Sequence, residues 1–297
     1  MATVTERSVH VNGIDLHLAE AGPGSGPPVV LLHGFPESWK MWRHQVPALA
    51  GAGHRVLAPD LRGFGETSRP AEVQAYKLRT LVADVTGLLD LLGIERAAVV
   101  GHDWGAGLAW RVAMFAPDRV ERLVAVSVGH PLAGIATGLA QWRMSWYRMW
   151  FLLPGVAERV LPADDWAFHR RWAWNDAERG QDPDLDRQLA DLSRDGALAA
   201  GLNWYRANID PVAFVAPDPA RFSLPAVACP TMGVWSSDDF ALTEAQMTHS
   251  ERYVTGPWRY ERIEAVDHWV PVHAPDRLNR LLLEFLPGEP AQPPQPW

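Results

Sequence analysis

Residues 101–105 read Gly-His-Asp-Trp-Gly and place an aspartate, Asp103, where it could act as a nucleophile. The apolar run Ala97–Val100 precedes them, and a helical pattern follows at once. A small-x-nucleophile-x-small sequence between a strand and a helix is typical of a nucleophile elbow, which exposes the central side chain above a sheet. A carboxylate at this tip would form an ester with its substrate. The structural alternative is a glycine-rich turn whose aspartate caps the next helix.

The two glycines of this turn have a physical reason. The turn is so sharp that a Cβ atom at Gly101 or Gly105 is expected to collide with the neighbouring strand or helix. The residue between them is expected to adopt a strained conformation. The free N–H groups of the following helix then face Asp103 and favour negative charge there.

Two further groups follow predicted strands and complete a catalytic set. Asp239 comes after the strand Thr231–Trp235, and His268 comes after the strand Arg259–Val266. Ligands gather at the carboxyl ends of the strands in an open α/β sheet. We expect His268 to activate a water molecule and Asp239 to orient it, in the chain order nucleophile, acid, histidine. Asp238 is the alternative orienting residue.

The segment His-Gly-Phe-Pro at residues 33–36 predicts a binding site for negative charge. It follows the buried strand Val29–Leu32. We expect the backbone N–H groups of Phe35 and Trp104 to form an oxyanion hole, while Pro36 stiffens the loop. A plain glycine–proline turn is the alternative. The side chains expected to line the substrate pocket are His33, Pro36, Trp39, His102 and Trp269.

Strand-like runs alternate with helical patterns along the chain, which predicts an α/β fold with a mostly parallel sheet. The predicted strands are Ser8–Val11, Leu16–Glu20, Val29–Leu32, Arg55–Ala58, Ala97–Val100, Leu123–Val128, Thr231–Trp235 and Arg259–Val266. The predicted helices, besides the one behind Asp103, are Ser38–Ala50, Leu78–Leu92, Glu244–Tyr253 and Asp276–Leu286.

From residue 131 to about residue 217 the chain is helical in pattern and has no predicted strand. We therefore expect a helical cap, 131–217, inserted between a first core part, 1–130, and a second core part, 218–297. The second core part ends in a proline-rich tail from about residue 287. Many of the 15 tryptophans lie in the cap, and such density predicts a wide apolar cavity.

Composition narrows the class of protein. The formal net charge of −8, without a basic cluster, disfavours nucleic-acid binding. The single cysteine, Cys229, excludes an internal disulfide and fits a reducing compartment. The N-terminus lacks a signal-peptide pattern, and no apolar run approaches the ~18 residues of a membrane span. We therefore expect a cytoplasmic protein. We also expect no bound metal, because the histidines lack the spacing of metal ligands. The outer face of the cap could pair two copies into a homodimer.

Taken together, the motifs resemble those of an α/β-hydrolase of the epoxide hydrolase group. They comprise residues 33–36, the loop Asp60–Pro70, residues 101–105, Asp239 before Phe240, and His268 before Trp269. The resemblance covers nearly the whole chain. It implies the α/β-hydrolase fold, with a mostly parallel eight-stranded sheet flanked by helices and an inserted helical cap. It also implies an epoxide and water as substrates, and no cofactor.

Two cap segments resemble the tyrosine-bearing segments of epoxide hydrolases. Residues 146–151 with residues 154–158 resemble the first, and Leu202–Arg206 resembles the second. The resemblance implies that Tyr147 and Tyr205 hold the epoxide oxygen and pass it a proton as the ring opens, which suits a phenol. The alternative is that both tyrosines only pack the cap.

The expected reaction begins with attack of Asp103 on an epoxide carbon and ends with hydrolysis of the ester to a vicinal diol. Haloalkane and haloacetate dehalogenases share this nucleophile and are the main alternative. Trp104 could supply a halide-binding N–H, although haloacetate dehalogenases typically carry arginine there. A non-catalytic ligand-binding protein would not need the acid–base groups. The aromatic surroundings favour hydrophobic or aromatic epoxides over small charged acids.

Overall fold

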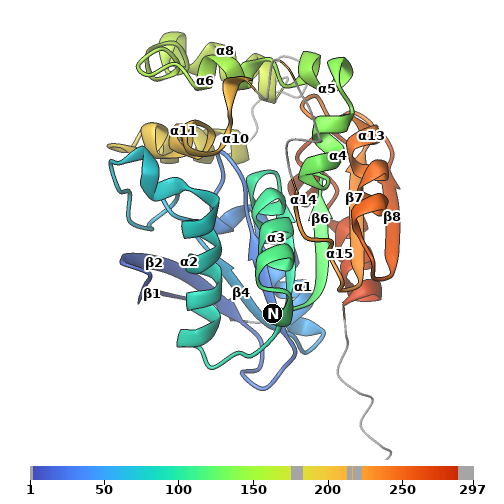
Figure 1. The fold of residues 1–297 in the computed structure, drawn as a ribbon. Coiled ribbons are helices and arrows are strands. Elements are labelled where there is room, and N and C mark those ends of the chain that lie inside the picture. The colour runs from blue at the N-terminus through green and yellow to red at the C-terminus, as the bar shows by residue number, and fades with distance from the viewer. Residues whose placement is uncertain (1–2, 175–182, 213–215, 217–222, 287–297) are drawn as a thin grey trace, which may run out of the picture.

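An eight-stranded sheet forms the centre of the molecule (Figure 1). The computed structural model describes residues 3–174, 183–212, 216 and 223–286. The strands lie in the order β1-β2-β4-β3-β5-β6-β7-β8. β2 runs antiparallel to β1 and β4, and all other pairs are parallel, so the predicted mostly parallel sheet is confirmed. The strands are β1 Thr5–Val11, β2 Ile14–Ala21, β3 Pro28–Leu32, β4 Arg55–Pro59, β5 Ala97–His102, β6 Val120–Val126, β7 Thr231–Ser236 and β8 Trp258–Ile263.

Burial on both faces explains the continuous apolar runs of the central strands. Every residue of β5 and of β7 is buried, as expected for parallel strands covered by helices on two sides. β5 pairs with β3 and β6, so that Leu32 lies beside Gly101 and His102 lies beside Val126. These three strands therefore end at one edge of the sheet, which is where the candidate residues follow.

Helices cover both faces of the sheet. In Figure 1, α2 and α3 pack together in front of it, and α1, which contacts α15, lies behind it. Among the described residues, no helix is long and apolar enough to cross a membrane. The helices of the core are η1 Trp39–Trp42, α1 Gln45–Gly51, η2 Val73–Tyr76, α2 Leu78–Leu91, α3 Trp104–Phe115, η3 Pro117–Arg119, α13 Glu244–Thr248, η5 His249–Tyr253, α14 Val270–His273 and α15 Pro275–Phe285.

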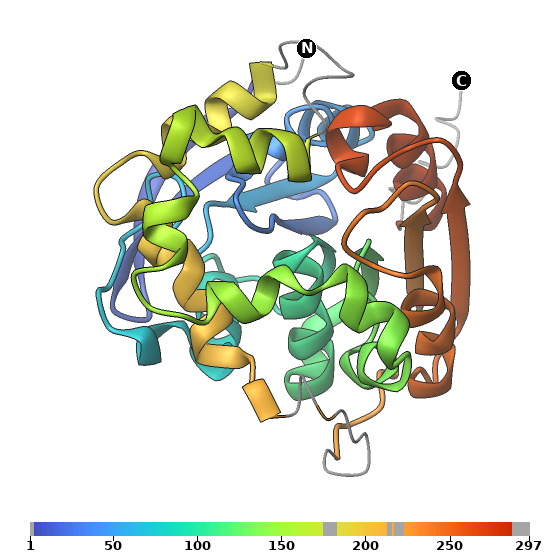
Figure 2. The ribbon, with the colours of Figure 1, turned by 90° about the horizontal axis from the view of Figure 1, so that it is seen from above.

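The chain between β6 and β7 forms a layer of helices, here called the cap segment, above the carboxyl edge of the sheet (Figures 1 and 2). Its first helix begins at Pro131, the predicted first residue of the cap. The predicted cap end at residue 217 and the predicted tail from residue 287 lie outside the described residues. The helices are α4 Pro131–Ala136, α5 Leu139–Met144, α6 Tyr147–Phe151, α7 Ala157–Val160, α8 Ala163–Ala173, α10 Pro183–Leu192 and α11 Ala197–Asn208.

Side-chain contacts fasten the cap segment to the core. The fully buried Glu37 of the core accepts hydrogen bonds from Arg187 Nη2 at 2.7 Å and from Gln188 Nε2 at 2.6 Å, both on α10. Farther along, the indole N–H of Trp204 on α11 donates to the carbonyl oxygen of Arg62 at 2.9 Å. A buried charge that is paired and hydrogen-bonded holds its partners in place, because separating them would leave that charge unsatisfied.

Several predicted elements differ from the structure, among them the predicted helix Glu244–Tyr253, which consists of α13 and the 3₁₀ helix η5. The predicted helix Ser38–Ala50 is instead a short 3₁₀ helix, η1, followed by α1. Pro47 explains the break, since it has no N–H to continue a helix and is tolerated in the first turn of a new one. The predicted strand Arg259–Val266 ends at Ile263, because the chain turns at Ala265, whose φ is +56°.

Several tryptophan side chains are buried in the packed interior and do not line the cavity. Trp42 and Trp110 are fully buried in the core, and Trp174 and Trp204 are fully buried in the cap segment. The high tryptophan content therefore reflects ordinary packing to a greater extent than the sequence predicted.

Candidate active site

Asp103 occupies a strained turn between β5 and α3. Its φ of +51° and ψ of −122° lie where side chains are rarely found, at a cost of about 1–3 kcal/mol. A Cβ atom at Gly101 would lie 2.2 Å from the carbonyl oxygen of Gly105, and one at Gly105 would lie 2.0 Å from that of Leu32. The predicted need for glycine at both positions is confirmed. A side chain at Gly101 would collide with the start of helix α3, and one at Gly105 would collide with the end of strand β3.

Backbone N–H groups face the Asp103 carboxyl group. The N–H of Phe35 donates to Oδ1 at 2.9 Å, and the N–H of Trp104 at the start of α3 helps to lower the pKa of the carboxyl. Burial raises the pKa of Asp103, but the hydrogen bond and charge of His268, together with the Trp104 N–H, outweigh that effect and lower it below its usual value. Asp103 is therefore a carboxylate at neutral pH, which a nucleophile requires.

His268 lies between two carboxylates. Its Nδ1–H donates to Oδ2 of Asp239 at 2.9 Å, and its Nε2 lies 3.6 Å from Oδ2 of Asp103. The other oxygen of Asp239 accepts two backbone N–H groups of the turn that follows it. Asp238 is exposed, and it is Asp239 that contacts the histidine.

The charge of these carboxylates changes the protonation of His268. Burial lowers the pKa of the imidazole, but the negative charge of Asp239, the hydrogen bond to it and the nearby carboxylate of Asp103 raise it to about 10. The imidazole is therefore protonated in the resting site, and it forms a charged triad with Asp103 and Asp239.

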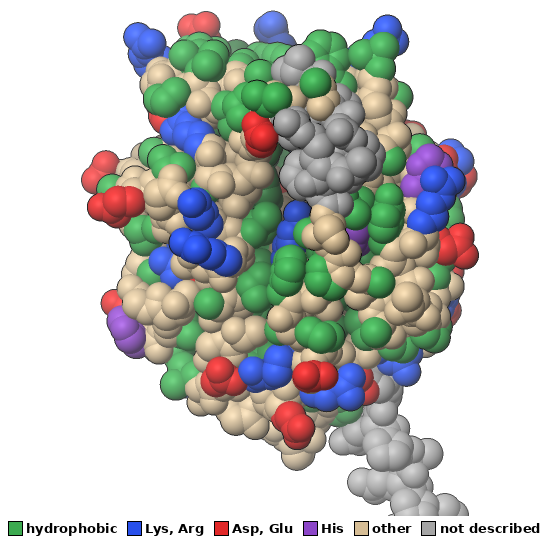
Figure 3. All heavy atoms as spheres, in the orientation of Figure 1, with side chains coloured by type: hydrophobic (Ala, Val, Ile, Leu, Met, Phe, Trp, Pro, Cys, Tyr) green, Lys and Arg blue, Asp and Glu red, His purple; other side chains and the backbone are tan. Residues whose placement is uncertain are grey.

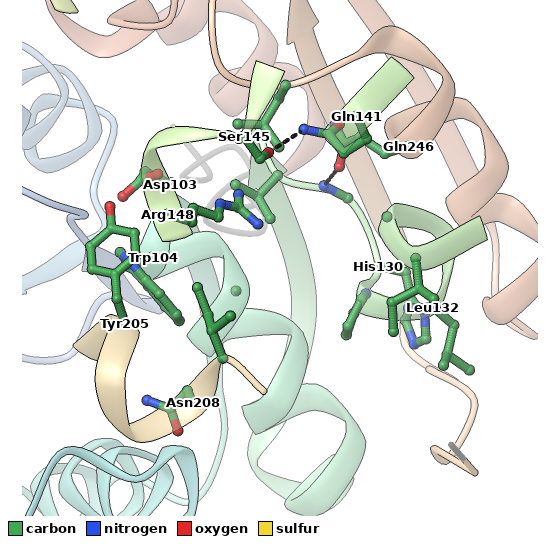
Figure 4. Close-up of a pocket in the computed structure, with 18 of the residues that line it drawn as sticks. Asp103, Trp104, His130, Leu132, Gln141, Ser145, Arg148, Tyr205, Asn208 and Gln246 are labelled. Carbon is green, nitrogen blue, oxygen red and sulfur yellow. Dashed lines mark hydrogen bonds between the residues drawn. The ribbon is translucent and has the colours of Figure 1, made fainter. Parts of the chain in front are cut away.

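Two phenols of the cap segment lie close to this carboxylate. Tyr147 on α6 and Tyr205 on α11 are both buried, with ring centroids 6.4 Å apart. Figure 4 shows the hydroxyl group of Tyr205 directed toward Asp103. Burial raises the pKa of both phenols, and the charge of Asp103 adds to the effect. Both side chains therefore keep their protons and can donate hydrogen bonds beside the carboxylate.

Two cavities meet at Asp103. The larger, of about 340 Å³, has a mostly apolar lining and extends along α3; Figure 4 shows Asp103 and Tyr205 at one end and His130 at the other. The smaller, of about 20 Å³, lies on the side of His268 and has room for about one water molecule. Asp103, Tyr147 and Tyr205 line both cavities. An organic molecule and a water could thus approach the same carboxylate from different sides.

The structure corrects part of the predicted substrate pocket. Pro36 and Trp269 line the smaller cavity, whereas His33, Trp39 and His102 line neither. The last three side chains are buried behind the site. There they pack beneath the turns that carry the functional groups.

His33 and His102 form hydrogen bonds with backbone groups of the site. Nε2 of His33 accepts the N–H of Leu61 at 2.9 Å, which leaves Nδ1–H to donate to the neighbouring carbonyl in the oxyanion loop. Nε2–H of His102 donates to the carbonyl oxygen of His268 at 2.8 Å. Burial lowers the pKa of His102 to about 4, so its ring is neutral. Both histidines therefore fix the position of catalytic backbone rather than contact a ligand.

Two arginines of the larger cavity were not identified from the sequence. Arg148 follows Tyr147 in the wall of the larger cavity, and the Tyr147 phenol raises the pKa of its guanidinium against the effect of burial, but nothing in the sequence separates it from a surface arginine. Arg111 lies eight residues after Asp103 on α3. The helical spacing of 103, 107 and 111 on one face would have pointed to it.

The chemical groups of the site are carboxylate, imidazole and phenol. In the described part of the chain, no three histidine, cysteine, aspartate or glutamate side chains gather so as to hold a metal ion.

Comparison with known proteins gives a consistent set of relatives. A family model described as the alpha/beta hydrolase fold matches residues 27–275. Epoxide hydrolase A of Mycobacterium tuberculosis is 35% identical, over 97% of this chain and 99% of the relative. A solved structure of novel epoxide hydrolases from metagenomes of hot environments matches with a TM-score of 0.85 and 32% identity, over 97% of this chain and all of that one, 100%. The crystal structure of Epoxide Hydrolase A from Mycobacterium thermoresistibile matches with a TM-score of 0.78 and 33% identity, over 96% and 98% of the two chains.

Proposed function

This chain belongs to the alpha/beta hydrolase fold family and to its epoxide hydrolases, and we propose that it opens an epoxide to a vicinal diol through a covalent ester on Asp103. One observation carries the proposal. A carboxylate on a strained elbow lies within reach of two protonated phenols on one side and of a histidine on the other.

The first step forms the ester. Oδ1 of Asp103 is held by the N–H of Phe35, which leaves Oδ2 to attack a carbon of the epoxide. As the C–O bond of the ring breaks, the phenols of Tyr147 and Tyr205 hydrogen-bond the departing oxygen, and one of them gives it a proton. Without this donation the ring would open to an alkoxide in apolar surroundings, which costs more free energy.

Esterification then changes the protonation of His268. Before the step, two carboxylates keep the imidazole protonated. The ester removes the negative charge of Asp103, so the pKa of the imidazole falls. Its proton replaces the one that the tyrosine lost, and Nε2 becomes a free base next to the smaller cavity.

The second step hydrolyses the ester. A water in the smaller cavity gives a proton to Nε2 of His268, and its oxygen attacks the ester carbonyl carbon. The N–H groups of Phe35 and Trp104 stabilise the negative charge on Oδ1. The bond from the carbonyl carbon to Oδ2 breaks, and the diol oxygen takes the proton of the new carboxyl group. Charged Asp103 and protonated His268 are restored.

The shape of the larger cavity supports a substrate with a sizeable apolar part. Its volume of about 340 Å³ and its mostly apolar lining suit a hydrophobic or aromatic epoxide. Carbon–halogen hydrolysis by the same ester route remains the alternative chemistry, with Trp104 in the cavity wall as its halide donor.

The proposal is tested by trapping the ester. We expect wild-type protein to convert styrene oxide to the diol and to release no halide from a panel of haloalkanes. Rapid mixing of His268→Gln with styrene oxide should give an adduct of the mass of one epoxide, located on Asp103 by peptide mapping. Asp103→Asn should give no adduct. An adduct of full amount on Asp103→Asn, or wild-type turnover by His268→Gln, would refute the mechanism, and Asp238→Asn serves as the matched control.

A further inference from the structure

The larger cavity follows one face of α3 away from the nucleophile. Asp103, Gly107 and Arg111 are spaced by four residues, and all three line it. Eight residues of α-helix span about 12 Å, so Arg111 stands about that far from the nucleophile along the helix axis.

Gly107 leaves the middle of this path open. A Cβ atom built there would meet no atom of the described residues within 4 Å, apart from its chain neighbours and the backbone of its own helix. In a helix glycine is less stable than alanine by about 1 kcal/mol, and no close packing of the described residues requires it at this position. A narrow ligand chain can therefore run past Gly107 from one end of the cavity to the other.

Among the described residues, Arg111 is a positive charge without a partner at the far end of the cavity. No hydrogen bond or ion pair joins its side chain to another residue of the described chain, and burial lowers its pKa to about 10. It remains protonated at neutral pH. A half-buried guanidinium without a counter-charge is unfavourable, so a ligand anion there would gain by pairing with it.

The groups around Arg111 do not supply that counter-charge. His130 at the same end is neutral, because burial and the charge of Arg111 lower its pKa to about 3. Asp210 also lines the cavity, but its described hydrogen bond is an acceptor contact with the N–H of Val212. Arg148 lies nearer the nucleophile, beside Tyr147.

Figure 3 shows hydrophobic side chains gathered around a hollow between the cap segment and the core, on the face that carries α3 and α4 in Figure 1.

We propose that Arg111 is an anion-binding subsite for epoxides that carry a carboxylate at the other end of an apolar chain. The inference rests on the proposed function, since it places the epoxide at Asp103. A separation of about 12 Å corresponds to roughly eight to ten carbon atoms in an extended chain. The cavity then binds a linear amphiphile, with its epoxide under the phenols, its chain along α3 and its carboxylate at Arg111.

The test compares an epoxy fatty acid of this length, with a terminal epoxide, with its methyl ester. For the wild-type protein we expect kcat/KM for the acid to exceed that for the ester. In Arg111→Gln the ratio of acid to ester should fall at least tenfold, as expected for loss of a charge-assisted hydrogen bond. Arg111→Lys, which keeps the charge, should retain most of the ratio. The surface variant Arg252→Gln, with the same change of charge, should leave it unchanged.

A binding measurement separates the subsite from the chemistry. The saturated fatty acid of the same length has no epoxide, so the change in its Kd between the wild-type protein and Arg111→Gln reports on the subsite without the reaction. It should weaken at least tenfold in Arg111→Gln and not in Arg252→Gln. An unchanged ratio together with an unchanged Kd in Arg111→Gln would overturn the subsite. If the wild-type protein binds the saturated acid through Arg111 but hydrolyses neither epoxide, the subsite stands and the proposed function fails.

Discussion

Replacing Asp239 by asparagine tests how the triad activates water, because the structure dictates how the new amide must lie. Oδ1 of Asp239 accepts the N–H groups of Ala241 and Leu242 at 2.8 and 3.0 Å. In Asp239→Asn the amide oxygen must occupy this position, and the NH₂ group then faces Nδ1 of His268. The imidazole has to accept there, so its proton moves to Nε2, the atom that should take the proton of water.

The magnitude follows from two effects. A charge pair at about 4 Å is worth about 4 kcal/mol at an effective dielectric constant of about 20, which corresponds to roughly 3 units in the pKa of His268. The wrong tautomer adds a kinetic penalty, and a comparable change in a serine protease triad lowers kcat by about 10⁴. We therefore expect ester hydrolysis to slow by about 10³ to 10⁴, while ester formation changes by less than about tenfold.

The assay is a rapid-quench reaction with styrene oxide followed by mass analysis of the intact protein. Asp239→Asn should accumulate close to one adduct for each protein molecule and release diol slowly. Asp238→Asn removes the neighbouring exposed charge and should show neither effect. The reasoning is refuted if Asp239→Asn turns over without accumulating ester, or if Asp238→Asn is impaired to the same degree.

Two further predictions concern stability. Glu37→Gln removes the buried charge that pairs with Arg187 and should lower the free energy of unfolding by about 3 kcal/mol in urea titrations, whereas Glu66→Gln at the exposed pair with Arg194 should cost less than about 1 kcal/mol; equal losses would contradict the role of burial. The pKa of His268 is raised on folding, from 6.5 to about 10, so its contribution is complete below pH 6.5 and is lost as the pH rises toward 10. Between pH 6.5 and pH 10 the free energy of unfolding of the wild-type protein should fall more steeply with pH than that of His268→Gln, by up to about 1.4 kcal/mol per pH unit. Urea titrations at several pH values measure this difference, and equal slopes for the two proteins would contradict the raised pKa.

The residues that carry the chemistry were accessible from the sequence because their positions are local. Asp103, Asp239 and His268 each follow a strand, and strand ends can be recognised from short apolar runs. The role of the glycines in the elbow also follows from local sterics. The comparisons confirm the family that these motifs predicted.

The support of the site depends on contacts across the chain and was not predictable from one sequence. His33 and His102 stand next to catalytic turns, so either could have contacted substrate. Their ring nitrogens are instead used by the backbone of Leu61 and His268, residues far away in the chain. The helical spacing places Arg111 on the same helix face as Asp103, but its lack of a partner among the described residues becomes visible only when the neighbouring side chains are placed.

The fastening of the cap segment through Glu37 has a consequence for the traffic of molecules. Glu37 stands two residues after Phe35, whose N–H holds the nucleophile, and it receives both Arg187 and Gln188. Lifting this part of the cap would pull on the loop that stabilises the transition state, so a hinged lid would open only at the expense of the catalytic geometry. We therefore expect reactants and products to pass through the hollow between the cap segment and the core (Figure 3). The width of that hollow should then limit which molecules enter before the length of the cavity does.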